Sequence, residues 1–333
     1  MDSLDMVELV KYLKTPIKLN TKPGDKVLII TDTAMDPILW QCLMAVGYDL
    51  GTRTNVAIMT PRSGTSGEPD PPIAAAWAES DMAILMTSQA MAHTDARIAA
   101  AKRGCKTILM EQVTVDLIVR GPGTADYDEM KATGAKIQKI LTEGKQVHVT
   151  TQFGTDIRFS IEGRIAQCEV GIAGPPWTGD VAAFPSGEVP IIPVEGTAEG
   201  IIVYDTSIHG VGLFKEPITV KVEKGRAVSI TGGSEAAKLR EIIETQGDEN
   251  SYNIAEFAPM LNPKAVPSGI MRQDKKIRGG AHIALGRNNT AGGGNKPGIT
   301  GTVYSKLHLD GVMKRVTFEV DGRTIYKDGK IVI

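Results

Sequence analysis

The chain up to about residue 143 alternates short apolar runs with segments of helical spacing. The apolar runs are KVLIIT (26–31), NVAIMT (55–60), MAILMT (82–87) and KTILM (106–110). Apolar runs of this length, bounded by turn residues, are typical of buried strands. Between them lie helical patterns, one of which opens at Pro37, a residue well suited to a first helical turn. This alternation predicts parallel βαβ units in an open α/β sheet.

After Gly144 the pattern changes to strict alternation of apolar and polar residues. It is seen in QVHVTT, DIRFSIEG, GIIVYD, PITVKVEKGRAVSI, KRVTFEVDGRTIY and KIVI. Alternation of this kind, with Gly-containing turns between the segments, predicts a mainly antiparallel sheet. One helix is expected at about 233–245. We therefore expect an α/β domain over residues 1–145 and a β-rich domain over 146–333.

Composition narrows the class of protein. The 333 residues are 42% hydrophobic with a net charge of -2, which gives no bulk attraction to nucleic acid or an anionic membrane. The longest basic cluster, Lys275, Lys276 and Arg278, has the pattern of a solvated turn. There is no signal peptide pattern and no apolar run of bilayer length. Three widely spaced cysteines favour a reducing compartment, so we expect a cytoplasmic protein.

Common nucleotide and hydrolase motifs are missing. The first strand-to-helix turn, TDTAMDP, lacks GxGxxG, and the chain contains no GK[ST] phosphate loop and no GxSxG elbow. Any chemistry is therefore expected from isolated polar residues. The five histidines are His93, His148, His209, His282 and His308.

His308 and Asp310 lie in YSKLHLDGV. On a strand, residues two apart point to the same face. A histidine and a carboxylate on one face can form half of a metal site. The alternative is a hydrogen-bonded pair on a sheet surface, which the spacing alone favours.

Glu256 and His282 are the other candidates for metal ligands. Glu256 is flanked by apolar residues in YNIAEFAPMLNP, and a buried glutamate is rare unless it is paired or metal-bound. His282 lies among glycines and apolar residues in GGAHIALG. The alternatives are a surface loop glutamate and a core histidine. Two imidazoles and two carboxylates together suit Zn, Mn or Fe(II).

His93 follows the expected strand MAILMT. Sites in open α/β sheets gather at the carboxyl ends of the strands, so His93 is a candidate general base facing the other domain. The alternative is a helix start beside Thr94. His148, in an alternating strand, and His209, in a Gly-rich turn, are interpreted as structural.

Four segments of the C-terminal half carry a resemblance to known proteins. GEVPIIPVEGTAEGIIVYD, NIAEFAPMLNP, GGAHIALG and KLHLDGV, in this order, resemble the aminopeptidase T family of metallo-aminopeptidases. A second branch with a similar scaffold is 2,5-dihydroxypyridine 5,6-dioxygenase, an Fe(II) ring-cleaving enzyme. In the first half AMAHTDAR is the best match. The resemblance to the aminopeptidases implies four metal ligands, which are Glu256, His282, His308 and Asp310.

Two features of the aminopeptidases have no counterpart. Their bridging Glu has no clear match, because the only acid between Glu256 and His282 is Asp274. Their catalytic Tyr falls on Asn289. These departures favour a single metal ion.

The dioxygenase branch matches differently. Of its His, His and Asp iron ligands, the last two align with His308 and Asp310. The first falls on Glu256, and its active-site base falls on His93. His282 is not a ligand position in that branch.

The ligand set favours a metal-dependent hydrolase of the aminopeptidase T-like type that acts on a small amide or peptide bond. Glu256 or Asp274 would take a proton from water and His93 would assist the leaving group. The expected cofactor is one divalent metal per chain, Zn, Mn, Co or Fe(II). One alternative is an Fe(II) dioxygenase that opens a hydroxylated N-heteroaromatic ring, and another is a non-enzymatic, metal-stabilised binding module. A small-molecule substrate and a homo-oligomer are expected, without nucleic-acid or membrane partners.

Overall fold

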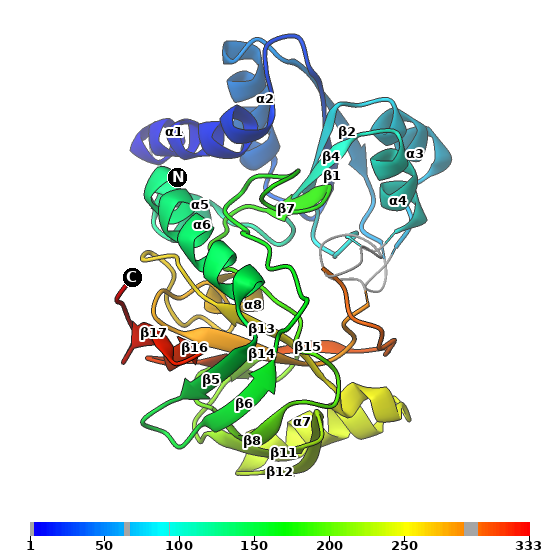
Figure 1. Ribbon diagram of the computed structural model, residues 1–333. Coiled ribbons are helices and arrows are strands. Elements are labelled where there is room, and N and C mark those ends of the chain that lie inside the picture. The colour runs from blue at the N-terminus through cyan, green and yellow to red at the C-terminus, as the bar shows by residue number, and fades with distance from the viewer. Residues whose placement is uncertain (1–2, 63–66, 93, 290–298) are drawn as a thin grey trace. The chain divides into compact units, whose positions relative to one another are not determined.

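The computed structural model describes residues 3–62, 67–92, 94–289 and 299–333. Contacts divide the chain into two compact units, coloured along the sequence in Figure 1. The first comprises Met1–Tyr127 and Glu169–Ser186, and the second comprises Asp128–Cys168 and Gly187–Ile333. Units defined by contacts need not coincide with independently folding domains. The division expected near residue 145 therefore stays a prediction.

The first unit is built on a parallel sheet. Its strand order is β2 (Arg53–Met59), β1 (Lys26–Asp32), β3 (Met82–Met86), β4 (Lys106–Leu109) and β7 (Val181–Ala183). Every neighbouring pair is parallel. All of β3 and all but the first residue of β1 are buried, as their apolar runs require. The predicted α/β sheet is confirmed, and β7 is an additional strand.

Helices connect these strands. They are α1 (Ser3–Asn20), α2 (Pro37–Asp49), α3 (Pro71–Ala78), α4 (Asp95–Lys102) and α5 (Val115–Val119), followed by the 3-10 turn η1 (Pro122–Thr124). α2 begins at Pro37 as expected, and the Asp36 side chain caps it by accepting a hydrogen bond from the Ile38 amide. The Thr94 hydroxyl caps α4 by accepting one from the Arg97 amide. Side-chain caps of this kind satisfy amides that lack partners within the helix.

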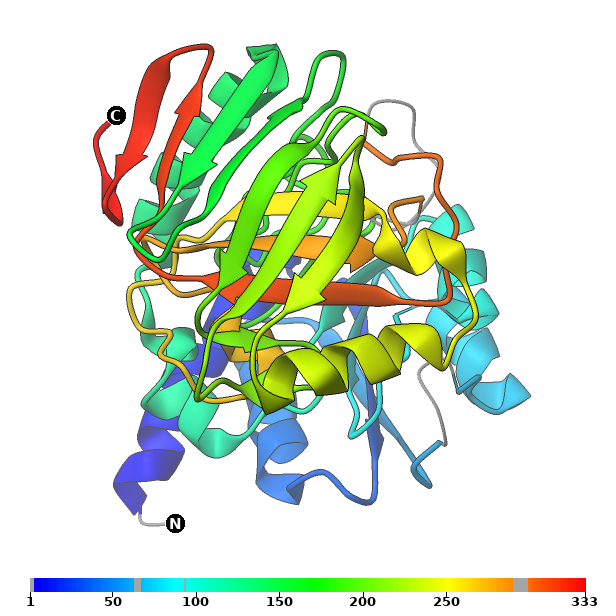
Figure 2. The same ribbon diagram turned by 90° about the horizontal axis from the view of Figure 1, so that it is seen from below.

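The second unit contains two antiparallel sheets. The larger has the order β12 (Arg226–Thr231), β11 (Ile218–Glu223), β8 (Glu199–Tyr204), β6 (Asp156–Ser160), β5 (Gln146–Thr150), β16 (Thr317–Val320), β17 (Arg323–Lys327) and β18 (Lys330–Ile331). Helix α6 (Tyr127–Glu143) precedes β5 along the chain. Helix α7 (Ser234–Glu244) packs against β11 and β12 (Figure 2). The helix expected at 233–245 is thus present.

The smaller sheet of this unit carries the candidate ligands. Its order is β10 (Gly212–Leu213), β9 (Ser207–Ile208), β15 (His308–Met313), β14 (Ala281–Gly286) and β13 (Ile254–Pro259), with the short helices η2 (Glu249–Tyr252) and α8 (Met271–Asp274) in its connections. The ring of Phe257 on β13 packs against Phe159 of β6 and Phe318 of β16, with centroids 5.4 and 5.5 Å away. Aromatic contacts between the two sheets therefore form part of the core.

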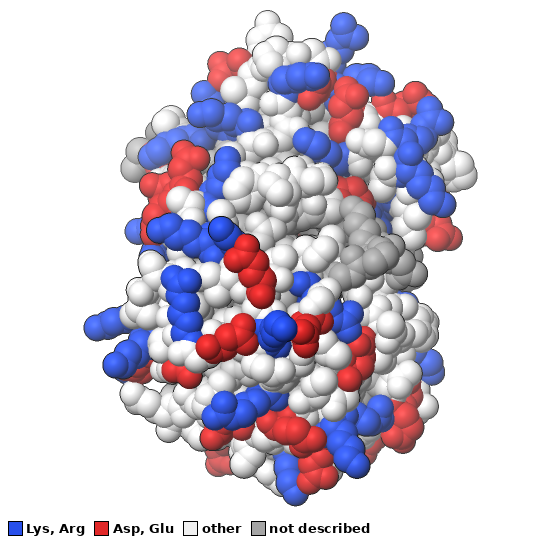
Figure 3. All heavy atoms as spheres, in the orientation of Figure 1, with Lys and Arg blue, Asp and Glu red and all other residues white. Residues whose placement is uncertain are grey.

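The surface agrees with the small net charge. On the face drawn in Figure 3, acidic and basic side chains of the described residues are interspersed. Within the described part of the chain, no helix combines the length and the apolar character needed to cross a bilayer.

Candidate metal centre

The register of β13, β14 and β15 brings two carboxylates to either side of a small residue. Glu256 is paired with Ala284 on β14, and Ala284 is paired with Asp310 on β15. Paired residues of neighbouring strands point to the same face of a sheet. The methyl group of Ala284 leaves space between the carboxylates. His308 shares this face, and its partner on β14 is Gly286, which has no side chain.

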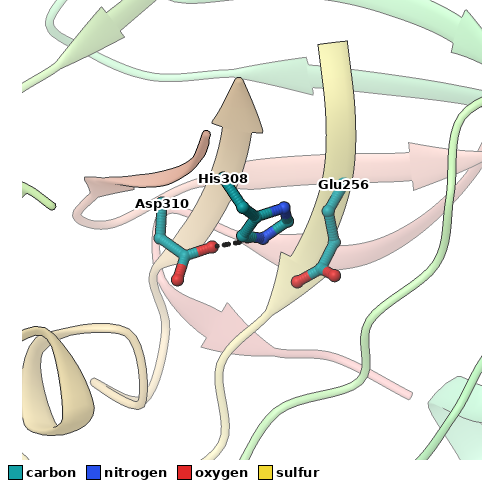
Figure 4. Close-up of side chains that lie close together, drawn as sticks. All are labelled: Glu256, His308 and Asp310. Atoms are coloured by element: carbon teal, nitrogen blue, oxygen red, sulfur yellow. Dashed lines mark hydrogen bonds and ion pairs between the residues drawn. The ribbon is translucent and has the colours of Figure 1, made fainter. Parts of the chain in front are cut away.

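Glu256, His308 and Asp310 consequently form a cluster, in which their side chains face one another (Figure 4). One ligand atom from each lies within 4.8 Å of the other two. His308 Nε2 is 3.1 Å from Asp310 Oδ1. Glu256 and Asp310 are buried and His308 is partly buried. One imidazole nitrogen and two carboxylate oxygens at these separations fit a single divalent metal ion.

The backbone fixes the orientation of the His308 ring. Its Nδ1 lies 2.7 Å from the carbonyl oxygen of Arg287. A carbonyl only accepts, so Nδ1 carries a hydrogen, and the Nε2 lone pair of the neutral ring points toward the cluster. Without a metal, burial lowers the pKa of His308, but the charge and hydrogen bond of Asp310 outweigh it and raise the pKa to about 9. Metal binding must therefore displace a proton.

The two carboxylate oxygens of Asp310 have different partners. Oδ1 faces His308, whereas Oδ2 lies 3.1 Å from Lys275 Nζ. Burial acts to raise the pKa of Asp310, but the charges of Lys275, His308 and His282 hold it well below its usual value. The carboxylate is therefore ionised, as a metal ligand must be.

Glu188 forms the centre of a second layer. Its side chain is 2% exposed, and its Oε2 lies 3.0 Å from His282 Nε2. Lys276 Nζ donates to Oε1, and Lys275 Nζ lies 3.8 Å from the same oxygen. Burial acts to raise the pKa of Glu188, but the lysine charges, first Lys275 and then Lys276, keep it well below the usual range.

This second layer was not predictable from the local sequence pattern. The sequence pattern predicts a solvated turn at Lys275 and Lys276, but their side chains are only 22% and 1% exposed. That interpretation is wrong for both residues, because each ammonium group lies against a buried carboxylate. Glu188 lies in the segment GEVPIIPVEG that carried the resemblance. Like Glu256, Glu188 is a carboxylate next to apolar residues, and this pattern could have indicated that it is buried.

The other predicted residues lie in different settings. His282 is completely buried beside the cluster, with Nδ1 3.5 Å from Asp310 and Nε2 3.7 Å from Glu256, but its hydrogen bond goes to Glu188. Asp274 is outside the cluster of three, and its oxygens accept hydrogen bonds from the Ser268 amide and hydroxyl and the Gly269 amide. His93 lies outside the described residues. The ligand role of His282 and the catalytic roles of Asp274 and His93 stay predictions.

Comparisons with known proteins identify the scaffold. A 2,5-dihydroxypyridine 5,6-dioxygenase of Pseudomonas putida is 24% identical over 261 residues, which are 75% of this chain and 71% of the relative. The solved structure of 2,5-dihydroxypyridine dioxygenase from the same species matches with a TM-score of 0.82 and 19% identity over 98% of this chain and 97% of that one. AmpT from Thermus thermophilus matches with a TM-score of 0.69 and 15% identity, over 98% and 99%.

These findings correct the predicted function. The expectation of an aminopeptidase T-like hydrolase is wrong, because the family match, the sequence relative and the solved structure with the higher TM-score all name the dioxygenase. The predicted superfamily and fold class are confirmed. The match to the family extends over residues 8–333, and the chain is therefore an enzyme that belongs to the 2,5-dihydroxypyridine 5,6-dioxygenase family.

Proposed function

We propose that this chain is a metal-dependent dioxygenase that opens a dihydroxylated N-heteroaromatic ring such as 2,5-dihydroxypyridine. The observation that carries the proposal is the Glu256, His308 and Asp310 cluster in a chain of this family. When bound, a divalent metal such as Fe(II) supplies a redox-active centre that brings O2 and an aromatic hydroxyl group together.

The protein's part would be to hold three ligands on one face of a sheet, and the metal would bind substrate and O2 at positions that these ligands do not fill. Non-haem Fe(II) oxygenases commonly use two histidines and one carboxylate. This cluster offers one histidine and two carboxylates, so its ligands neutralise the charge of a divalent ion. Oxygen ligands of this kind suit Fe(II) and Mn(II).

Second-layer contacts orient the ligands. The Arg287 carbonyl fixes the ring nitrogen that His308 presents. Partners of this kind typically contribute 10- to 100-fold to metal affinity or activity. A ring hydroxyl must also lose its proton before it binds a metal, and we assign this step to His93 on the strength of the AMAHTDAR segment.

The test is O2 uptake by Fe(II)-loaded protein. Protein purified without added metal is loaded with Fe(II) under anaerobic conditions and mixed with 2,5-dihydroxypyridine and O2. We expect equal consumption of O2 and substrate, followed by an O2 electrode and by the ultraviolet absorbance of the ring. His308→Ala should lose metal and activity. The matched control is His148→Ala, which removes a surface histidine paired with Asp156 at 2.8 Å and should retain both.

Two results would count against the proposal. Folded, Fe(II)-loaded protein that consumes no O2 with 2,5-dihydroxypyridine or other dihydroxylated pyridines would refute the reaction. Full metal occupancy in His308→Ala would refute the ligand assignment, whatever the activity.

A further inference from the structure

Lysine side chains lie among the carboxylates beside the metal cluster. Lys275 Nζ is 3.1 Å from Asp310 Oδ2 and 3.8 Å from Glu188 Oε1, so one ammonium group lies between two carboxylates. Lys276, which is fully buried, donates to the same oxygen of Glu188. The carboxylates of this pocket are thus partly neutralised before any metal binds.

A pocket with this many acidic and imidazole groups could in principle hold two metals. Paired divalent ions in enzymes lie about 3.5–4 Å apart and share carboxylate ligands. In such a pair the two oxygens of Asp310 would be divided between the ions. Here Oδ1 faces His308 Nε2, but Oδ2 is held by Lys275. A lysine ammonium has three donors and no lone pair, so it cannot ligate a metal, and its charge repels a second cation.

Two further groups beside the cluster, Glu188 and His282, are also engaged. His282 Nε2 is hydrogen-bonded to Glu188. Its Nδ1 has no hydrogen-bond partner among the described residues and lies 3.5 Å from Asp310 Oδ1, on the side of the first site. Glu188 is held by Lys276 as well. Glu188 and His282 are therefore bound to each other.

We propose that Lys275 is an internal cation that takes the place of a second metal. The cluster then binds one divalent ion per chain, and binds it less tightly than it would without the ammonium group. The inference rests on the metal site of the proposed function, but it concerns the number and affinity of the ions and requires no turnover.

The size of the effect follows from the charges. A divalent ion and an ammonium group about 6 Å apart repel each other by roughly 1.4 kcal/mol even at the dielectric constant of water, which corresponds to about tenfold in affinity. Inside a protein the effective dielectric constant is lower, so removal of this charge should raise affinity by at least about tenfold. A purely structural role of Lys275 predicts the opposite sign, since its loss would loosen Asp310 and weaken binding.

The experiment is calorimetric titration of Mn²⁺ into metal-free protein, with electron paramagnetic resonance to detect coupled ions. Wild-type protein should bind one Mn²⁺ per chain. Lys275→Gln should bind it at least about tenfold tighter. Lys275→Glu, which places a carboxylate beside Asp310 and Glu188, should bind two ions with an exchange-coupled signal. Lys264→Gln, which removes an exposed lysine of the same unit, is the control and should match the wild type.

Two Mn²⁺ per wild-type chain, or unchanged or weaker binding by folded Lys275→Gln, would overturn the inference. Circular dichroism establishes folding first. If neither Lys275 variant folds, the wild-type stoichiometry decides alone, one ion supporting the inference and two refuting it. Protein that binds one Mn²⁺ and behaves as expected, but consumes no O2 when loaded with Fe(II), would refute the proposed function and leave this inference standing.

Discussion

Glu188→Gln should destabilise the protein strongly although Glu188 is outside the cluster of Glu256, His308 and Asp310. The carboxylate accepts from Lys276 and lies 3.0 Å from His282 Nε2, and all three side chains are at most 2% exposed. The variant keeps the size of the side chain but leaves a buried ammonium group without its counter-charge. Breaking a buried ion pair in this way costs about 3–5 kcal/mol.

The assay is urea denaturation at pH 7, compared with a matched pair at the surface. Lys145 Nζ lies 2.9 Å from Glu162 Oε1, with the two side chains 64% and 61% exposed. Exposed pairs contribute roughly 0–1 kcal/mol, so Glu162→Gln should scarcely change the midpoint. If the free energy of unfolding falls with urea concentration at the same slope in each variant, the same folded and unfolded states are being compared.

A double variant distinguishes the cost of an unpaired buried charge from the cost of altered packing. Glu188→Leu combined with Lys276→Met removes both charges, and buried pairs replaced by apolar residues often lose little stability. The double variant should therefore be more stable than Glu188→Gln. If Glu188→Gln costs no more than Glu162→Gln, the buried network does not stabilise the fold and the reasoning is refuted.

Four further predictions follow from the same structure. Asp310→Asn should lose most of its metal while remaining folded, and full occupancy on metal analysis would contradict this. Gly311→Ala places a Cβ 2.4 Å from the Tyr204 ring and should cost about 1–3 kcal/mol in urea denaturation; an unchanged midpoint would show that the ring can move. Partial burial raises the pKa of Glu195, but hydrogen bonds from the Thr302 amide and other donors outweigh it and lower the pKa. The stabilisation by ionised Glu195 is therefore present above the ordinary glutamate pKa and is lost as pH falls through the lowered pKa of the folded protein. Wild type should melt at a higher temperature than Glu195→Gln at neutral pH, and this difference should vanish in acid. His93→Ala should keep its metal and lower kcat by roughly 10²–10⁴-fold, and a wild-type rate would exclude it as the base.

Much of the fold was predictable from local patterns. Strands β1 and β3 are buried apolar runs, which the sequence displays directly. Strand β7 was not predictable, because it has three residues in a segment rich in Gly and Pro, and its pairing with β4 joins residues more than 70 positions apart. A strand of three residues is too short to show a periodic pattern. It is defined only by its pairing with β4 at the edge of the sheet.

The candidate site, like the fold, was only partly predictable from the sequence. The spacing of His308 and Asp310 predicts a common face, and the structure places them 3.1 Å apart. Glu256 joins them only because Ala284 is paired with both acids, and that register depends on strand pairing that no local pattern reveals. Adjacent lysines such as Lys275 and Lys276 are also ambiguous in sequence, since the carboxylates that bury them come from distant segments.

The charges of the pocket connect the second layer to the proposed reaction. Glu188, Glu256 and Asp310 place three carboxylates in the pocket, and the cationic side chains that act on them include Lys275, Lys276 and Arg272. A divalent ion that took the place of the proton on His308 would add one further positive charge to this pocket. Charge of one sign in a partly desolvated site favours a ligand of the opposite sign. A dihydroxylated pyridine that has lost a ring proton would be such a ligand, so the proposed role of Lys275 predicts that the ring binds as an anion.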